Sequence, residues 1–344
     1  NGIVDKFIGD GIMALFPGSA DDALRAGIDM LHQLATYNIG RSHAGFIPIR
    51  IGIGINTGLV MMGTVGGHNR MDSTVIGDAV NLASRLEGLT KNYGTPLVIS
   101  ANTLHSLDDQ DAYHIRFIDR LRIKGRYQVQ SVYEVFDADP EPLRLAKLAT
   151  QHTFEEALAL YHLGHADLAQ PLLQECLRIV PDDRAVRVYL DRCKHFLRQG
   201  ASPNELLIEK EVGWRKDYSI GIEEIDMRHR EQLDCIAMLE DQVLTGDPAA
   251  NTTLDNYAEH IALLNSSEEN LMQRYDYPFI TDHMKQHQAF DRAFADLRHE
   301  IDSQERDPRY LRFCIRMVMA DWQINHMTKS DLHLGHFLQR AGVS

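Results

Sequence analysis

The chain has 344 residues, a formal net charge of −14 and 44% hydrophobic residues. This length predicts two or three domains with substantial cores, and the acidic balance argues against nucleic-acid binding, which needs a basic surface. We see no signal-peptide pattern in these residues and no apolar run of about 18 residues to cross a membrane, and the four scattered cysteines lead us to expect a reducing cytoplasm. Because the sequence begins with Asn1 rather than methionine, we expect it to be part of a longer chain, in which an upstream membrane anchor would be out of view.

The first region, residues 1–138, alternates short β-like runs with helical stretches and predicts an α+β domain. The run VDKFIGDGIMALF predicts a hairpin with Asp10 at its tip, a position typical of turn residues. Farther on, DSTVIGDAVNLASRLEG predicts a turn and then a helix, on which Asn81 and Arg85 share one face. Taken singly, these side chains indicate only a polar surface.

The second region, residues 139–205, shows helical periodicity throughout. It looks like a tetratricopeptide-type helix pair, with Phe154, Ala157 and Leu160 on one face and Pro181 at a turn. Because one such unit is too short for a solenoid, we interpret the region as a helical connector.

The third region, residues 213–344, is again helical, contains eight of the seventeen histidines, and has the spacing of four antiparallel helices. His283 and His287 are four residues apart, which places them on one helical face roughly 6 Å apart along the axis. Further helical positions supply two more histidines and two carboxylates: His229, Glu268, His326 and Asp331. Several histidines with two carboxylates on helices are the ligands of a carboxylate-bridged di-iron site in a bundle.

The stretches KFIGD, GINTG with GTVG, and TVIGDAVNLASRLEG, in this order, resemble the class III nucleotide cyclase catalytic domain over residues 1 to about 137. The segment STVIGDAVNLASR is most similar to the bicarbonate-responsive bacterial subgroup. The resemblance implies a ferredoxin-like core, present here only in part. It assigns Asp10 to a catalytic Mg²⁺ or Mn²⁺, Lys6 and Thr74 to the purine, and Asn81 and Arg85 to the ribose and the transition state.

These side chains favour ATP as the substrate, with guanylate cyclase as an alternative. Lys6 can only donate hydrogen bonds, which suits N1 of adenine, and the Thr74 hydroxyl can accept one from the adenine amino group. The family's other metal-binding aspartate lies on a strand upstream of the hairpin and has no counterpart among these residues. The family's site forms between two protomers, so we expect a homodimer, and we expect this stretch alone to be inactive.

The pattern GWRKDYSIGIEEIDMRH, EENLM, HMKQH and NHMTKSD resembles a bacterial hemerythrin domain over residues 213 to about 338. The resemblance implies that His283, His287 and His326 hold one iron and His229 the other, with Glu268 and Asp331 bridging the two. His326 and Asp331 are five apart, which a regular helix would splay by roughly 140°, so a wider turn or a helix end is expected there.

One ligand of the hemerythrin pattern is missing. The position four residues before Glu268 is Leu264, so we expect one or two irons per domain, with one of them short of a nitrogen. His260 lies roughly 12 Å along the axis from Glu268 and could reach the site only through a bulge in the polar run 265–267. We interpret His333 and His336 as surface residues.

Together the regions predict an adenylate cyclase regulated by an iron-containing domain that senses O₂, NO or redox state. One alternative is an oxygen- or iron-binding protein whose cyclase-like part is an inactive dimerisation scaffold. Another is an iron-free bundle used only for packing.

Overall fold

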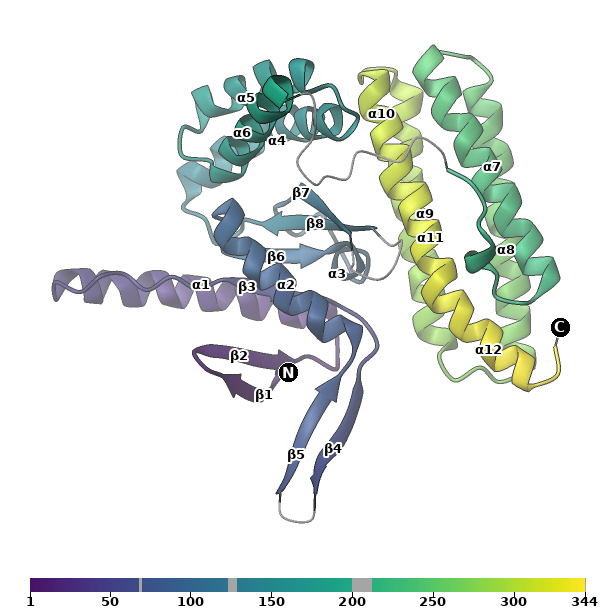
Figure 1. Cartoon of the computed structure of the whole chain (residues 1–344), viewed down its shortest axis with the longest axis horizontal. Helices are drawn as coiled ribbons and strands as arrows, with labels where there is room; N and C mark the ends of the chain where they lie inside the picture. Colours follow the sequence, from purple (N-terminus) through teal and green to yellow (C-terminus); the bar gives the residue numbers. More distant parts are fainter. Residues whose placement is uncertain (68–69, 123–128, 200–211, 344) are drawn as a thin grey trace. The chain divides into compact units, whose positions relative to one another are not determined.

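The computed structural model describes residues 1–67, 70–122, 129–199 and 212–343, without the side chains of residues 64–67, 70–74, 76, 121 and 122. The fold divides into two compact units. The first holds Asn1–Leu121, Ser131–Leu158 and Ala166–Pro203, and the second holds the remaining residues, chiefly Asn204–Ser344. Figure 1 shows the helices and strands of both units. None of the described helices has the length and apolar character needed to cross a membrane.

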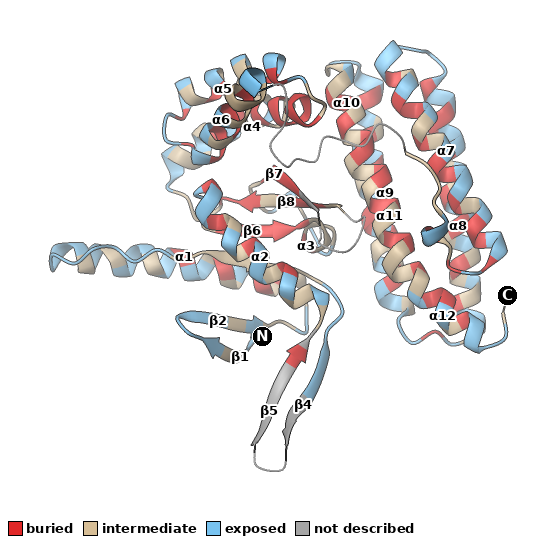
Figure 2. Ribbon diagram, viewed as in Figure 1, coloured by how far each residue is buried: buried red, intermediate tan, exposed pale blue. Residues whose placement is uncertain are grey.

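The first unit is built on a four-stranded sheet, which confirms the predicted α+β class. Its strands, in the order β3-β6-β8-β7, are β3 (Ile53–Ile55), β6 (Leu97–Ser100), β8 (Val129–Val135) and β7 (Ile115–Arg122). β3 pairs parallel with β6, which pairs antiparallel with β8. Helices α1 (Ala20–His43), α2 (Asp78–Tyr93) and the short α3 (Ala101–His105) belong to the same unit. Figure 2 shows that the middle of the sheet is buried, and Leu24 of α1 packs there against Leu97 and Ile99.

Two hairpins form small sheets of their own in this unit. The predicted hairpin is confirmed as β1 (Ile3–Ile8) and β2 (Gly11–Leu15). Gly9 at its tip has φ +64°, a left-handed conformation that glycine adopts without strain. The second hairpin consists of β4 (Met61–Gly67) and β5 (Arg70–Ile76). The turn predicted over the start of DSTVIG is therefore wrong, because Asp72–Ile76 belong to β5 and pair with β4. The three glycines of β4 weaken its strand signal, which hid the pairing from sequence reasoning.

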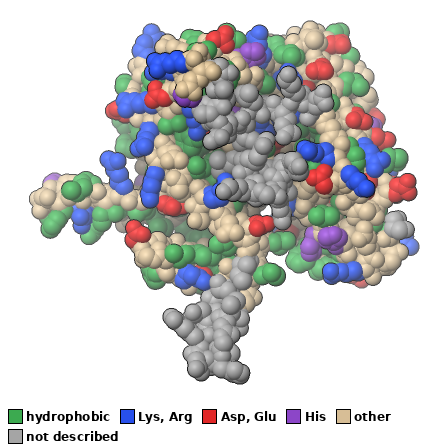
Figure 3. Space-filling view, viewed as in Figure 1, with side chains coloured by type: hydrophobic (Ala, Val, Ile, Leu, Met, Phe, Trp, Pro, Cys, Tyr) green, Lys and Arg blue, Asp and Glu red, His purple; other side chains and the backbone are tan. Residues whose placement is uncertain are grey.

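Large hydrophobic side chains remain exposed on the first unit. On the β1–β2 hairpin they are Ile3, Phe7 and Ile8. Others, including Met30 and Tyr37, lie along α1, where hydrophobic side chains are visible on the projecting helix in Figure 3. Exposed large hydrophobic side chains in such number are typical of an interaction site.

The connector consists of three helices rather than the predicted pair: α4 (Glu141–His162), α5 (Ala166–Ile179) and α6 (Arg184–Gln199). The first of them, α4, starts at Glu141, directly after Pro140, a residue well suited to the start of a helix, so the described part of region 139–205 holds one helix more than expected. Phe154, Ala157 and Leu160 are all buried, as predicted for one apolar face.

The second unit contains α7 (Glu223–Thr245), α8 (Ala250–Arg274), α9 (Ile280–Ser303) and a fourth, interrupted helical run. That run consists of α10 (Pro308–Ile315), the π-helical segment η2 (Arg316–Asp321), α11 (Trp322–His326), the π-helical segment η3 (Met327–Asp331) and α12 (Leu332–Arg340). A common hydrophobic core includes Leu233 of α7, Leu254 of α8, Phe290 of α9 and Met319 of the fourth run. Each helix therefore turns an apolar stripe inward.

Candidate functional site

The six predicted iron ligands converge in the interior of the second unit. The side chains come from all four helical runs: His229 (α7), Glu268 (α8), His283 and His287 (α9), and His326 and Asp331 (fourth run). All six are buried, and they form two overlapping groups whose potential ligand atoms lie within 4.8 Å of one another in each group. One group is Glu268, His283, His287 and His326, and the other is His229, Glu268 and Asp331.

Glu268 and Asp331 each direct one oxygen toward His229 and the other toward the three histidines His283, His287 and His326. Glu268 Oε2 lies 3.2 Å from the Nε2 atoms of both His283 and His287, whereas its Oε1 lies 3.9 Å from His229 Nε2. Asp331 Oδ1 lies 3.0 Å from His326 Nε2 and 3.3 Å from His283 Nε2. Its other oxygen, Oδ2, lies 3.2 Å from His229 Nε2. Carboxylates placed in this way between two imidazole groups can bridge two cations.

A widened helical turn makes this arrangement possible. Segment η3 (Met327–Asp331) is π-helical, so the chain turns more slowly between His326 and Asp331 than in a regular helix. The five-residue spacing of these two side chains therefore still brings them within 3.0 Å of each other. The structure confirms the wider turn expected from the spacing.

Neighbouring polar and aromatic groups orient the histidines. His326 Nδ1 lies 3.1 Å from Gln286 Oε1, which also accepts a hydrogen bond from Ser330. If Nδ1 donates to Gln286, Nε2 is left unprotonated and directed at the carboxylates. Trp322 stacks on His326 with ring centroids 4.6 Å apart, and Trp214 stacks on His229. Sequence reasoning missed Gln286, Trp214 and Trp322, since no spacing rule connects them to the ligands.

The electrostatics of this interior show that the carboxylates need positive charge beside them. Burial opposes ionisation of Asp331, but His326, His229 and His283 outweigh it and hold its pKa well below the usual range. Burial likewise acts to lower the pKa of His283, but Asp331 and Glu268 raise it to about 10. Burial lowers the pKa of His326, which favours its neutral, metal-ligating form.

The unsatisfied polar atoms test whether a metal fits here. His229 Nε2, Glu268 Oε1 and both oxygens of Asp331 are buried. They approach the neighbouring imidazoles or carboxylates to between 3.0 and 3.9 Å, but none has the geometry of a hydrogen bond with a described residue. Buried polar atoms normally have a partner, and four such atoms at one place are accounted for when they share a cation. Imidazole and carboxylate donors suit iron and other first-row transition metals, so the residues fit the group that the resemblance implies.

Leu264 offers no ligand and packs instead with Met272 and Tyr277 in a small hydrophobic cluster, where its exposed fraction is 2%. α8 runs as an α-helix from Ala250 to Arg274, so the alternative in which a bulge would bring His260 to the site is wrong. His260 instead lies 3.9 Å from Cys235 Sγ.

His333 and His336 are exposed, as expected. His333 Nδ1 lies 2.7 Å from the hydroxyl of Tyr277.

In the first unit, the predicted nucleotide-site residues lie on three elements. Lys6 is on β1, where it pairs with Asp5 at 3.3 Å, and Asp10 is exposed at the β1–β2 turn. Thr74 lies on β5, and its side chain is outside the described part of the chain. Asn81 and Arg85 are both exposed on α2.

The local fold explains why Asn81 and Arg85 face outward. Leu82 and Leu86, one position farther along α2, are buried and occupy its inner face. β3 packs directly beneath, because a Cβ atom at Gly54 would collide with the backbone of Ala83 and Glu87. This close approach fixes the height of α2 over the sheet and turns the polar pair toward solvent.

Comparisons with known proteins bear on the first unit. The family model for the adenylate and guanylate cyclase catalytic domain matches residues 6–135. An adenylate cyclase of Anabaena cylindrica is 48% identical over 140 residues, which are 39% of this chain and 28% of that protein. The terminal-differentiation specific adenylate cyclase of Dictyostelium discoideum is 37% identical over 198 residues, 56% of this chain and 9% of that protein. The crystal structure of the adenylyl cyclase CyaB from P. aeruginosa is 31% identical and covers 40% of this chain and 72% of that one, with a TM-score of 0.34. The chain thus spans less than a third of either curated relative.

Proposed function

We propose, for a chain whose residues 6–135 carry an adenylate and guanylate cyclase catalytic domain, that the complete protein converts ATP to 3′,5′-cyclic AMP and pyrophosphate. Similarity to proteins named adenylate cyclases in Anabaena cylindrica and Dictyostelium discoideum supports this reaction. The structural observation that best supports the proposal is the exposure of four residues. Partly or fully exposed positions, where a nucleotide could reach them, are held by Lys6, Asp10, Asn81 and Arg85.

Each residue has a role that suits its chemistry. Arg85 presents a planar guanidinium that can hold two phosphoryl oxygens and the charge that develops on them. Asn81, one turn earlier, orients the ribose, while Lys6 and Thr74 read the adenine. Asp10 supplies a carboxylate for Mg²⁺ or Mn²⁺, which commonly binds one or two carboxylates together with substrate phosphates. Such ions, when bound, activate the 3′-oxygen and neutralise the leaving pyrophosphate.

The assembly that we propose is a homodimer with its sites between protomers. The base- and phosphate-reading residues of one protomer would face the metal-binding carboxylates of the other. The exposed apolar side chains of the β1–β2 hairpin and α1 support a partner surface on this unit.

The test of the reaction uses the complete natural protein that contains these residues. We expect Asp10→Ala to abolish cyclic AMP formation while the unfolding temperature stays unchanged, because an exposed turn side chain contributes little packing. Asp111→Ala removes the same charge from another exposed position of the first unit, outside α1 and the β1–β2 hairpin, and serves as the matched control. Wild-type turnover in Asp10→Ala would contradict the metal role, and a wild-type protein without cyclase activity would contradict the reaction.

For the second unit we propose a hemerythrin-like four-helix bundle that holds iron. The observation that best supports this proposal is the placement of two carboxylates. Glu268 and Asp331 each direct one oxygen to His229 and the other to the side of the site that holds His283, His287 and His326. His283, His287 and His326 would hold one iron, and His229 with the two carboxylates would hold the other. O₂, NO or the iron redox state would be the signal that regulates the cyclase.

A further inference from the structure

The C-terminal end of α2 is held by a buried polar cluster that includes two residues of connector helix α6. Tyr93 of α2 donates a hydrogen bond to Asp119 of β7, and Tyr189 of α6 donates a second one to the other oxygen of Asp119 at 2.8 Å. Arg192, also on α6, donates to the Tyr93 hydroxyl at 2.9 Å and lies 3.5 Å from Asp119. Its guanidinium carbon is 4.7 Å from the ring centroid of Tyr189 and 5.6 Å from that of Tyr93. We call these four residues the α2–α6 clamp.

Burial makes the clamp a firm contact rather than a surface ion pair. The side chains of Tyr93 and Tyr189 are almost completely inaccessible. Burial, together with the charge of Asp119, raises the pKa of Tyr93 and the pKa of Tyr189 well above the usual value, so both hydroxyls stay protonated donors. Inside a protein such hydrogen bonds are stronger than in water, and an unpaired partner is costly.

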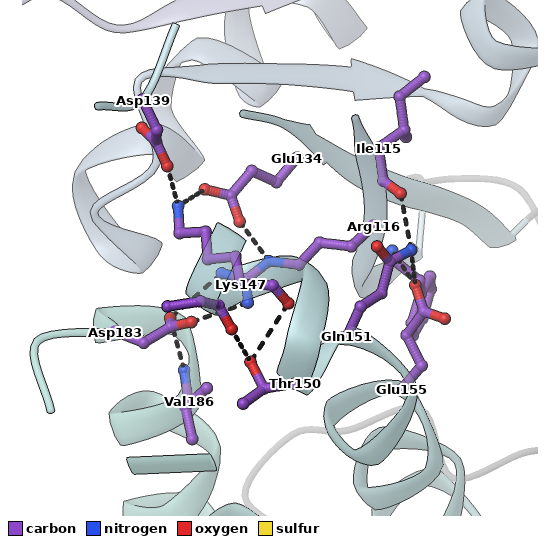
Figure 4. A network of polar contacts seen from close by, with 12 residues as sticks. Ile115, Arg116, Glu134, Asp139, Lys147, Thr150, Gln151, Glu155, Asp183 and Val186 are labelled. Atoms are coloured by element: carbon purple, nitrogen blue, oxygen red, sulfur yellow. Dashed lines mark hydrogen bonds and ion pairs between the residues drawn. The ribbon is translucent and has the colours of Figure 1, made fainter. Parts of the chain in front are cut away.

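Helix α6 is itself anchored to the sheet at its other end, as Figure 4 shows. Asp183, directly before α6, accepts two hydrogen bonds from Arg116 of β7, at 2.7 and 3.2 Å, and one from the backbone of Val186. Arg116 also donates to Glu134 of β8 at 2.6 Å, and Lys147 of α4 donates to the same carboxylate at 2.7 Å. The network leaves α6 little freedom to slide along the sheet, so the clamp holds α2 against a fixed support.

The residues that would bind the ribose and phosphates lie on the helix that the clamp holds. Arg85 is eight residues before Tyr93, roughly 12 Å along the axis of α2. A helix moves nearly as a rigid rod, so a shift at Tyr93 is carried to Asn81 and Arg85. Positioning of this kind is demanding, since a misplacement of about 1 Å in a catalytic group can cost roughly 100-fold in rate.

We propose that α6 is a positioning element of the cyclase, and that Tyr189 and Arg192 act through Tyr93 to set where α2 presents Asn81 and Arg85. The inference rests on the proposed function and extends it: the catalytic machinery includes a helix far outside residues 6–135. The connector is then a working part of the enzyme, through which a signal that moves α6 would alter the rate.

Two conservative variants of the complete natural protein test the clamp. Tyr189→Phe removes one buried hydroxyl and keeps the ring, and Arg192→Lys keeps the charge but loses the planar fork. We expect each to lower kcat roughly 10- to 100-fold with little change in KM for ATP, because the clamp acts on transition-state geometry. Backbone amide exchange in residues 78–93 should rise in both variants, since α2 is held less firmly. Lys194→Ala, a change to a half-exposed side chain on the same helix, should alter neither quantity.

Two outcomes separate failure of the clamp from failure of the proposed function. If the wild type is active and both variants keep its kcat and its amide exchange over 78–93, the clamp does not position α2 and the inference is overturned. A fall in kcat with unchanged exchange in α2 would overturn it as well, because the effect would then come from elsewhere. An inactive wild type would contradict the proposed reaction itself, independently of any variant. The clamp would then have no catalytic role.

Discussion

In our proposal, Leu264 is the residue that limits how many metal ions the second unit can hold. It stands one helical turn before Glu268, on the face that the ligands share, and it is packed in an apolar cluster. The three-histidine side has nitrogen donors from His283, His287 and His326, whereas the other side has His229 alone beside the carboxylates. Iron on the second side would therefore bind more weakly and exchange faster.

We expect Leu264→His to raise the iron content of the protein from near one toward two per chain. The new imidazole would project from the correct face of α8, at some cost in packing because Leu264 is buried. Iron analysis of the purified protein before and after the change is the measurement, and Leu263→His, an exposed neighbour, is the control. Two tightly bound irons in the wild type would show that Leu264 does not limit the number of irons bound.

In the proposed cyclase site, Lys6 and Thr74 are the residues expected to select the base. Lys6→Glu with Thr74→Cys reverses the donor and acceptor pattern, because guanine offers donors where adenine offers an acceptor. The expected result is a fall in kcat/KM for ATP, with GTP use emerging, measured as cyclic AMP and cyclic GMP from competing substrates. An active double variant with the wild-type preference for ATP would remove both residues from base recognition.

At the scale of the secondary structure, β3 and the backbone of α2 are in close contact at Gly54. Gly54 has no space for a side chain, since a Cβ atom there would meet backbone of α2 that cannot move aside easily. We expect Gly54→Ala to destabilise the first unit by about 1–3 kcal/mol, as overpacked sites generally do. It should also lower cyclase activity by lifting α2.

Gly88→Ala is the matched control for this change. It lies on α2 itself with open space around the position of a Cβ atom, and alanine is favoured over glycine in a helix by about 1 kcal/mol. A glycine-to-alanine change should therefore stabilise the first unit at Gly88 and destabilise it at Gly54. Thermal unfolding of the two variants measures both signs, and equal unfolding temperatures would show that the β3–α2 contact is looser than described.

At the scale of the whole molecule, the chain has two compact units with separate cores. Metal binding should stabilise only the unit that holds the ligands. At a free iron concentration about 100 times Kd, linkage adds about 2.7 kcal/mol to that unit. Calorimetry should show two transitions, of which iron removal lowers one, and His283→Ala should abolish this shift. A single transition insensitive to iron would contradict the metal site.

Local sequence patterns predicted the candidate ligand residues of the second unit, but they did not predict the buried polar networks of the first unit. His283 and His287 share a face through a short spacing that any helix fixes, and the five-residue spacing of His326 and Asp331 pointed to a widened turn. Arg116, by contrast, lies in a strand whose alternating charges suggest a solvated edge, yet it is buried against Asp183, 67 residues away. Ion pairs between such distant residues leave no local signal, which is why β7 and both polar networks escaped prediction. For the same reason, the aromatic rings that stack on His229 and His326 were not foreseen.

The widened turn at Met327–Asp331 also determines which changes in length the fourth helical run can tolerate. Each residue added to a helix advances its rotational phase by about 100°, so a π-helical turn absorbs one extra residue without rotating the helix beyond it. The segment is therefore a point where a single-residue deletion has a defined outcome. Loss of Thr328 would close the turn into a regular helix, leave His326 and Asp331 four apart on one face, and keep Leu334 and Leu338 in phase with the core. Deletion of one residue inside α12, a regular α-helix with no π-helical segment described after it, has no such slack, and it would rotate the rest of α12 by about 100° relative to the core.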